Sequence, residues 1–277
     1  MTGFSLCVIG NSHAGAVWQA WKGGTIAARQ GFSMTVFASQ ASSVEMDHRD
    51  GSLVPVDPAV SEMFAFTSGG KDRVEIDKYD AFLLVGLGYG IDLARTFTRC
   101  NVFEHLAHGS ADIVVSHACL VEIIRGHNAK SAALAFAGQV RADSAAPILI
   151  YPTPFRPETM LSEENDPCLS DQALLDNIMP RSIAAVSELA SQNGCEVFWQ
   201  HPETVALPGL TKAKFAKGAV NLRSSIERDS KHVNPDFAVL SLQAILQRLG
   251  QASPESAPGH INSHDIEPET RARLTGP

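Results

Sequence analysis

A serine, a histidine and an aspartate occupy two positions from which they can act together as a nucleophile and its activating base. Ser12 follows the apolar run 4–9, and Asp229 and His232 form the only Asp-x-x-His segment in the chain. A serine hydroxyl becomes a good nucleophile when an imidazole accepts its proton and a carboxylate orients that imidazole. The spacing predicts that Ser12, His232 and Asp229 form a triad that attacks ester carbonyls.

Both positions also have plainer interpretations. A serine at a turn from strand to helix commonly caps the helix by accepting a backbone N–H bond. Asp229 and His232 can equally form a surface pair that holds their own loop in place. These alternatives stay open at the level of sequence, because neither motif is specific by itself.

Nucleotide binding is a third interpretation of the first motif. Gly10 and Gly15 match the outer positions of a G-x-G-x-x-G fingerprint, but Ser12 replaces the middle glycine that lets the backbone approach a pyrophosphate. The second apolar run is followed by Ser39 and Gln40 rather than by the acidic residue that binds a ribose. Both departures disfavour a dinucleotide.

Apolar runs and helical patterns alternate along the chain. Strands are expected at 4–9, 34–38, 81–87, 147–151 and 195–200, and helices at 13–30, 92–107, 117–142, 171–192 and 235–249. This alternation predicts an α/β fold with a mostly parallel, five-stranded sheet covered on both faces. Residues 42–78 are expected to be an irregular excursion. No linker divides residues 1–250, which we expect to form one domain followed by a loose tail, 251–277.

The predicted sheet gathers further candidate residues at one edge, because ligands of such folds bind outside the carboxyl ends of the strands. Gly88 and Gly90 follow the third strand, where they can donate backbone N–H groups or simply allow a tight turn. Arg156 follows the fourth strand and can bind a polar or anionic substrate group. His13 either contacts substrate or is an ordinary residue of the first helical turn.

The two motifs together resemble those of the SGNH (GDSL) hydrolase superfamily. In that family a G-D-S-x turn follows the first strand and a D-x-x-H segment precedes the last helix. Here the segments are Gly10-Asn11-Ser12-His13 and Asp229-Ser230-Lys231-His232, and the resemblance covers residues 4–250. It implies a three-layer α/β/α sandwich of the flavodoxin-like type, with strand order 2-1-3-4-5. It also implies esterase, lipase, deacetylase or acyltransferase chemistry without a metal.

Two departures from the family pattern affect the expected chemistry. Asn11 stands where the family usually has aspartate. Gly90 stands where the family's G-x-N-D segment has the asparagine that donates to the oxyanion, and losing one such donor typically costs about 10²–10³ in rate. The candidate replacements are the backbone N–H groups of Ser12, Gly88 and Gly90 or the side chain of Asn11. The alternative is a non-catalytic, SGNH-like module that binds a ligand with a degenerate oxyanion hole.

Composition narrows the function classes further. The 277 residues carry a net charge of −8 without a run of Lys or Arg, so neither nucleic acid nor an anionic membrane is an expected partner. Five scattered cysteines without a CxxC pair argue against a zinc ribbon or disulfide scaffold. We expect a cytoplasmic serine esterase, with no cofactor or metal, that acts on carbohydrate or small-molecule esters, possible activities being O-acetyl esterase and acyltransferase. The sequence leaves the oligomeric state open.

Overall fold

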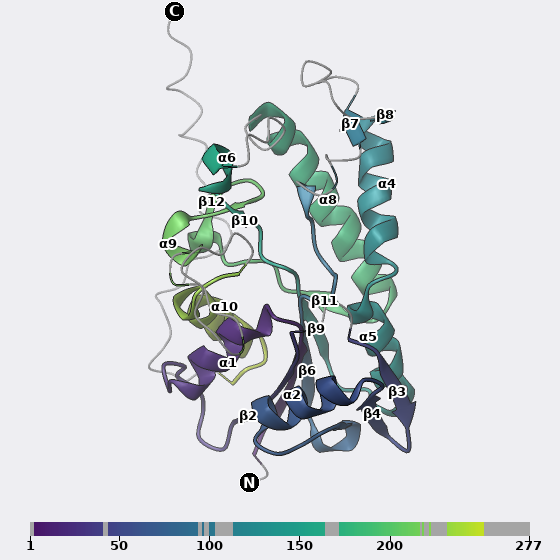
Figure 1. Cartoon of the computed structure of the whole chain (residues 1–277), viewed down its shortest axis with the longest axis vertical. Coiled ribbons are helices and arrows are strands. Elements are labelled where there is room, and N and C mark those ends of the chain that lie inside the picture. The colour runs from purple at the N-terminus through teal and green to yellow at the C-terminus, as the bar shows by residue number, and fades with distance from the viewer. Residues whose placement is uncertain are drawn as a thin grey trace, which may run out of the picture.

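A five-stranded parallel sheet forms the centre of the computed structural model, which describes residues 3–40, 44–93, 96, 100–102, 113–163, 172–216, 218, 222 and 232–251 (Figure 1). The strand order is β2-β1-β6-β9-β11, which matches the expected order 2-1-3-4-5. The strands are β1 (Ser5–Gly10), β2 (Ser33–Ala38), β6 (Ala81–Val85), β9 (Ile148–Tyr151) and β11 (Glu196–Val197). The α/β fold class predicted from the alternating pattern is confirmed.

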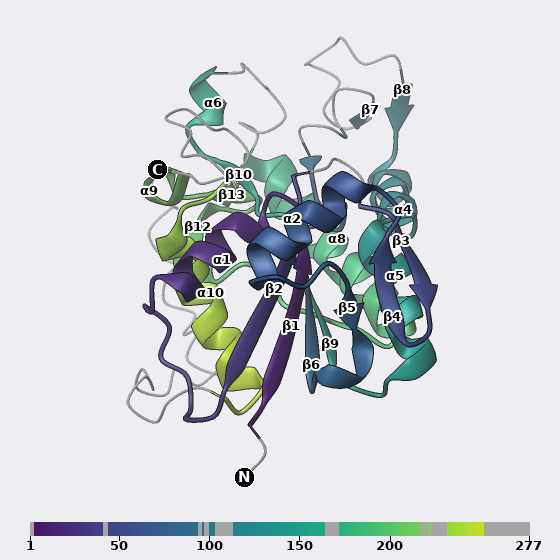
Figure 2. The same ribbon diagram turned by 60° about the horizontal axis from the view of Figure 1, so that its bottom comes forward.

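Helices cover both faces of this sheet, because successive strand residues point to opposite sides. In β1, Leu6 and Val8 join one buried cluster, whereas Cys7 and Ile9 join the other. Figure 2 shows the two layers of helices on either side of the strands. The first layer is α1 (Ala14–Lys22) and α10 (Pro235–Arg248), and the second is α4 (His117–Asn128), α5 (Ala132–Asp143) and α8 (Gln172–Gln192).

The strand register places three chain segments at one edge of the sheet. Gly10 at the end of β1 is opposite Val85 at the end of β6, and Val85 is opposite Tyr151 at the end of β9. The loops that follow these residues therefore leave the sheet side by side. This common edge brings together the segments that carry Ser12, Gly88 and Arg156.

The prediction that residues 42–78 are irregular is wrong. The described part of this range, residues 44–78, contains a small antiparallel sheet and a helix, namely β3 (Met46–Arg49), β4 (Ser52–Pro55), α2 (Pro58–Ser68) and β5 (Val74–Glu75), followed by the 3₁₀ turn η1 (Ile76–Lys78). Asp57 caps α2 by accepting a bond from the Ala59 N–H at 2.9 Å, and Pro58 is the first helical residue. Asp followed by Pro is a helix-start signal that the low apolar periodicity obscured.

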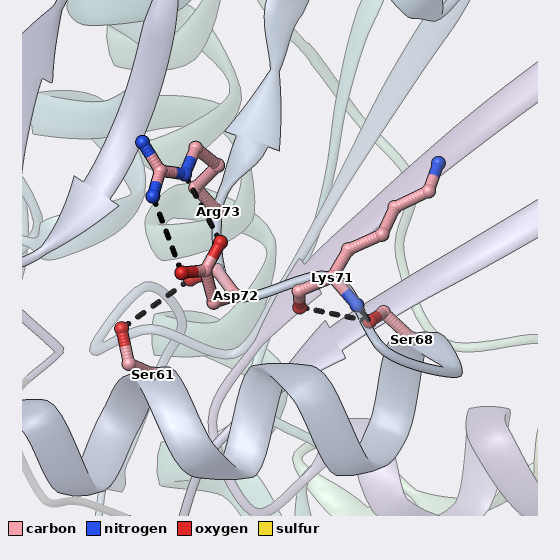
Figure 3. A network of polar contacts seen from close by, with 5 residues as sticks. All are labelled: Ser61, Ser68, Lys71, Asp72 and Arg73. Carbon is pink, nitrogen blue, oxygen red and sulfur yellow. Dashed lines mark hydrogen bonds and ion pairs between the residues drawn. The ribbon is translucent and has the colours of Figure 1, made fainter.

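The chain leaves α2 through a compact polar turn (Figure 3). Gly69 takes the left-handed conformation, with φ of 81°, that ends many helices. The Ser68 hydroxyl accepts the Lys71 N–H at 2.8 Å and lies 2.9 Å from the Lys71 carbonyl oxygen, to which it donates. Asp72 then pairs with Arg73, with a shortest distance of 3.0 Å between charged atoms. These bonds return the chain from α2 to the sheet.

Several other expected boundaries also differ. Strand β7 (Cys100–Val102) lies within the segment 92–107 that was expected to be a helix. It pairs with β8 (Ile113–Val115), which follows that segment. The expected helix 117–142 is two helices, because Ser131 caps α5 with a bond from the Leu134 N–H. The first helix ends at Lys22, before Gly23 and Gly24, rather than at residue 30.

Short elements lie beyond the carboxyl edge of the main sheet, on the side of α1 and α10 (Figure 2). A three-stranded sheet pairs β10 (Arg156–Pro157) with β13 (Leu210–Thr211), which pairs in turn with β12 (Val205–Leu207). With them are α6 (Met160–Glu163), α9 (Ala213–Ala216) and the 3₁₀ turn η3 (Pro202–Thr204). Within the described ranges, no helix is long and apolar enough to cross a membrane. The predicted tail, apart from Gln251, lies outside the described residues.

Candidate active site

Ser12 lies in the turn between β1 and α1, and its hydroxyl does not cap the helix. The N-cap position belongs to His13, which makes no side-chain capping bond. Ser12 contributes only its carbonyl oxygen, which accepts the Gly15 N–H at 3.1 Å, and its Oγ has no hydrogen bond with any described residue. The capping interpretation of Ser12 is therefore wrong, and the half-buried hydroxyl is left for another role.

Asn11, directly before the serine, has a fixed side chain. Its Oδ1 accepts the His13 N–H at 3.1 Å. This position requires glycine at residue 86, because a Cβ there would lie 2.6 Å from Asn11 Oδ1 and 3.2 Å from His13 Cδ2. Gly86 also has a φ of 68°, which other residues rarely adopt. The turns after β1 and β6 are thus built against each other.

His232 lies beside this turn although it is 220 residues away in sequence. Its ring contacts the ring of His13, with centroids 4.9 Å apart and planes tilted by 35°. The loop is anchored two residues later, where the Asn234 N–H donates to the Phe215 carbonyl at 2.8 Å and Asn234 Nδ2 donates to the Lys214 carbonyl at 2.9 Å. The tertiary structure thus places the imidazole next to the residue that follows Ser12. Asp229 lies outside the described residues.

The loop after β6 is a tight turn with an unusual backbone. The Tyr89 N–H donates to the Gly86 carbonyl at 2.9 Å, and the two central residues, Leu87 and Gly88, both have positive φ, as in a type I′ turn. A positive φ in leucine stores about 1–3 kcal/mol of strain, and such strain often marks functional loops. The Gly88 N–H has no hydrogen bond with any described residue, so it can donate to a ligand.

Gly90, in contrast, has both of its backbone groups occupied. Its N–H donates to Asn128 Oδ1 at 2.6 Å, and its carbonyl accepts a bond from Asn128 Nδ2 at 2.9 Å. The same Nδ2 donates to the Ile124 carbonyl in α4 at 2.8 Å. The Gly90 N–H is therefore not available as an oxyanion donor. The other predicted donors are the N–H groups of Ser12 and Gly88 and the side chain of Asn11. Asn128 is fully buried, and no sequence signal pointed to its role.

The backbone at Gly90 also explains why no asparagine stands there. Its φ is 145°, and a Cβ at this position would lie 3.2 Å from the Thr153 nitrogen. Thr153 is itself held by a bond from its N–H to the Tyr89 carbonyl at 2.8 Å. A side chain at residue 90 would require the two loops to move apart.

Arg156 forms an ion pair that sequence reasoning did not anticipate. Its guanidinium donates to Asp92 Oδ2 at 3.0 Å, with Arg156 80% buried and Asp92 about two-thirds buried by side-chain area. The pair joins the loop after β6 to β10. The ion pair uses one Nη atom of the guanidinium, Nη2. Binding of a substrate anion by Arg156 stays a prediction.

Two cavities border the turn that carries Gly88. One, of about 230 Å³, lies between residues 88–92 and α4, where Ile123 and Ile124 contribute apolar surface. The other, of about 610 Å³, lies between the β3–β4 hairpin and α5, and both Asn11 and Gly88 line it. Gly88 and His127 line both cavities. Among the described residues, no cluster of three His, Cys, Asp or Glu side chains is arranged to hold a metal ion.

Comparisons with known proteins return three distant structural neighbours of the chain. A lipase, Lip_vut3, from a goat rumen metagenome aligns over 90% of this chain and 98% of its own, with TM-score 0.43 and 12% identity. A carbohydrate esterase family 2 enzyme with a carbohydrate-binding domain, from Corynascus thermopiles (Myceliophthora fergusii), aligns over 89% and 67%, with TM-score 0.41 and 13% identity. The periplasmic domain of a lipopolysaccharide acetyltransferase from Salmonella ser. Paratyphi A aligns over 90% and 85%, with TM-score 0.40 and 12% identity.

No protein-family model and no curated protein sequence matches the chain. By their descriptions the structural neighbours are a lipase, a carbohydrate esterase and an acetyltransferase domain, all at low identity.

Proposed function

We propose that this chain is a serine acyl hydrolase that cleaves ester bonds with Ser12 as nucleophile, His232 as general base and Asp229 as the carboxylate that orients the imidazole. The proposed substrates are small-molecule or carbohydrate esters, with O-acetyl esters and acyl transfer within this scope. The observation that carries the proposal is the contact between the His232 and His13 rings, 4.9 Å between centroids. It brings a distant imidazole beside the residue that follows Ser12.

The surroundings of Ser12 support a nucleophilic role. Ser12 follows β1 at the carboxyl edge of the sheet, where ligands bind in folds of this kind. Its Oγ makes no structural hydrogen bond with a described residue, so no other task competes for it. In a free enzyme the bond between serine and histidine is often loose and tightens only when substrate is bound.

The proposed reaction has two steps. Ser12 Oγ forms a bond to the carbonyl carbon while its proton moves to His232, and the carbonyl π electrons move to the oxygen. The C–O bond to the alcohol then breaks, and His232 returns the proton to the departing alkoxide. Water repeats the sequence on the acyl-enzyme and releases the carboxylic acid.

A non-catalytic ligand-binding module is the second candidate function. The observation that favours it is the occupied N–H of Gly90, which removes one possible oxyanion donor. The second candidate predicts that a ligand binds at the edge of the sheet without Ser12-dependent turnover.

The deciding experiment measures kcat/KM for an aryl acetate in the wild type and in Ser12→Ala, His232→Ala and Asp229→Asn. Labelling of Ser12 by a fluorophosphonate, mapped by mass spectrometry, accompanies it. Ser61→Ala, which changes a serine on α2 far along the chain, is the matched control. We expect the fluorophosphonate to label Ser12 in the wild type. Turnover should be lost in the three site variants and kept in Ser61→Ala. Equal turnover in wild type and Ser12→Ala, without labelling, would favour the binding module.

A further inference from the structure

We propose that the side-chain amide of Asn11, together with the Gly88 N–H, forms the oxyanion hole of this enzyme. The inference rests on the proposed function, because an oxyanion forms only if Ser12 attacks a carbonyl. It assigns a catalytic contact to a residue next to the nucleophile and places the substrate carbonyl between the turns after β1 and β6.

The orientation of the Asn11 amide follows from its bonds. The His13 N–H is a donor, so the atom 3.1 Å from it must be the acceptor Oδ1 rather than Nδ2. The amide nitrogen therefore faces away from the helix start. Asn11 Nδ2 has no hydrogen bond with any described residue, and the residue is only half buried. A fixed donor with free N–H groups is what an oxyanion hole requires.

A second hydrogen-bond donor, the Gly88 N–H, lies at the same cavity as Asn11. Gly88 and Asn11 both line the 610 Å³ cavity, and the Gly88 N–H likewise makes no hydrogen bond with a described residue. The strained turn at Leu87 holds that N–H in place. A Cβ at residue 86 would lie only 2.6 Å from Asn11 Oδ1, so glycine at this position lets the turns after β1 and β6 pack against each other.

Two other groups near this edge are occupied, whereas the Ser12 N–H makes no hydrogen bond with a described residue and is available as a third donor. The Gly90 N–H bonds to Asn128, and a side-chain donor at residue 90 is disfavoured by the φ of 145° and by the Thr153 nitrogen, 3.2 Å from where a Cβ would lie. The amide of Asn128 is itself spent on Gly90 and Ile124. Asn11 is thus a side-chain amide next to the nucleophile whose Nδ2 makes no hydrogen bond with a described residue.

The amide acts on the charge that develops during the first step. As Ser12 Oγ bonds to the carbonyl carbon, the carbonyl oxygen becomes an alkoxide, and the N–H groups of Asn11 and Gly88 donate to it. The charge disappears when the C–O bond to the alcohol breaks. Because the bonds strengthen only in the transition state, their loss lowers kcat and leaves KM nearly unchanged.

Two substitutions separate the donor from the acceptor of Asn11. Asn11→Asp keeps the oxygen that accepts the His13 N–H but has no N–H group, whereas Asn11→Ala removes both. We expect both variants to lose about 10²–10³ in kcat, with KM within about threefold of wild type. Asn193→Asp is the matched control, because it makes the same change on an exposed residue.

The outcomes distinguish this inference from the proposed function. If Asn11→Asp keeps wild-type kcat while Asn11→Ala is impaired, Asn11 only shapes the turn and the inference is overturned. Rates are compared at the pH plateau of each variant, so that an effect of the new carboxylate on His232 is not mistaken for loss of a donor. If Asn11→Ala does not fold, Asn11→Asp decides alone. A wild type without Ser12-dependent turnover overturns the proposed function, and the inference with it.

Discussion

Replacing Asn128 by leucine tests how the loop after β6 is held. Leucine is nearly the same size, but it removes the two bonds that connect α4 to Gly90, at 2.6 and 2.9 Å. Each buried polar group that loses its partner costs about 1–3 kcal/mol. Gly90 is partly exposed, so water can replace part of the loss, and the total should be about 2–4 kcal/mol.

Two smaller effects do not change this result. The third bond of Asn128, to the Ile124 carbonyl at 2.8 Å, is to a helical carbonyl that also accepts the backbone N–H of the fourth following residue. Leucine has a better helix propensity than asparagine, but that gain is below about 0.7 kcal/mol. The loss of the bonds to Gly90 therefore dominates.

The assay is thermal unfolding followed by circular dichroism, supported by urea unfolding. At about 2–4 °C per kcal/mol for a chain of this size, we expect Tm to fall by about 5–15 °C. Asn193→Leu is the control, because Asn193 makes the same kind of bond to a helical carbonyl, at 2.8 Å to Leu189, without reaching another loop. If Asn128→Leu lowers Tm no more than Asn193→Leu does, the bridge to Gly90 does not hold the loop.

Two further predictions concern buried groups. Tyr151 Oη lies 2.6 Å from Ser241 Oγ, so Ser241→Ala should lower the free energy of unfolding by urea by about 1–3 kcal/mol. Adding Tyr151→Phe should recover part of this loss, because it removes the unpaired hydroxyl. A double variant with a lower free energy of unfolding than Ser241→Ala would contradict the pairing. Burial raises the pKa of the Cys7 and Cys195 thiols, so neither forms much thiolate at about pH 8. Iodoacetamide should therefore modify exposed Cys119 in the native protein and reach Cys7 and Cys195 only after unfolding, as peptide mass spectrometry would show. Native labelling of Cys7 would contradict the buried position of β1.

The main sheet could be predicted because its strands are short, apolar runs separated by helical patterns, whereas its strand order was expected only from the resemblance to the SGNH family. The same reasoning failed for residues 42–78, where the strands of the β3–β4 hairpin are only four residues long and half exposed. It also failed at 117–142, because one continuous helical pattern contained a serine that caps a second helix. Short elements and internal caps leave weak periodicity, so sequence reasoning merges or misses them.

For the candidate site, the sequence alone determined the residue types and their position after strands, because a nucleophile, a base and a carboxylate are recognisable by chemistry. Ser12 and His232 are both recognisable in this way. Tertiary structure decided which groups remain available. The ring of His232 contacts His13, Ser12 does not cap α1, and Asn128 occupies the backbone of Gly90. The contact of Asn128 with Gly90 joins residues 38 positions apart, and that of His232 with His13 joins residues 219 positions apart. Whether Ser12 caps α1 depends on the direction of backbone N–H groups. The local spacing of residue types encodes neither.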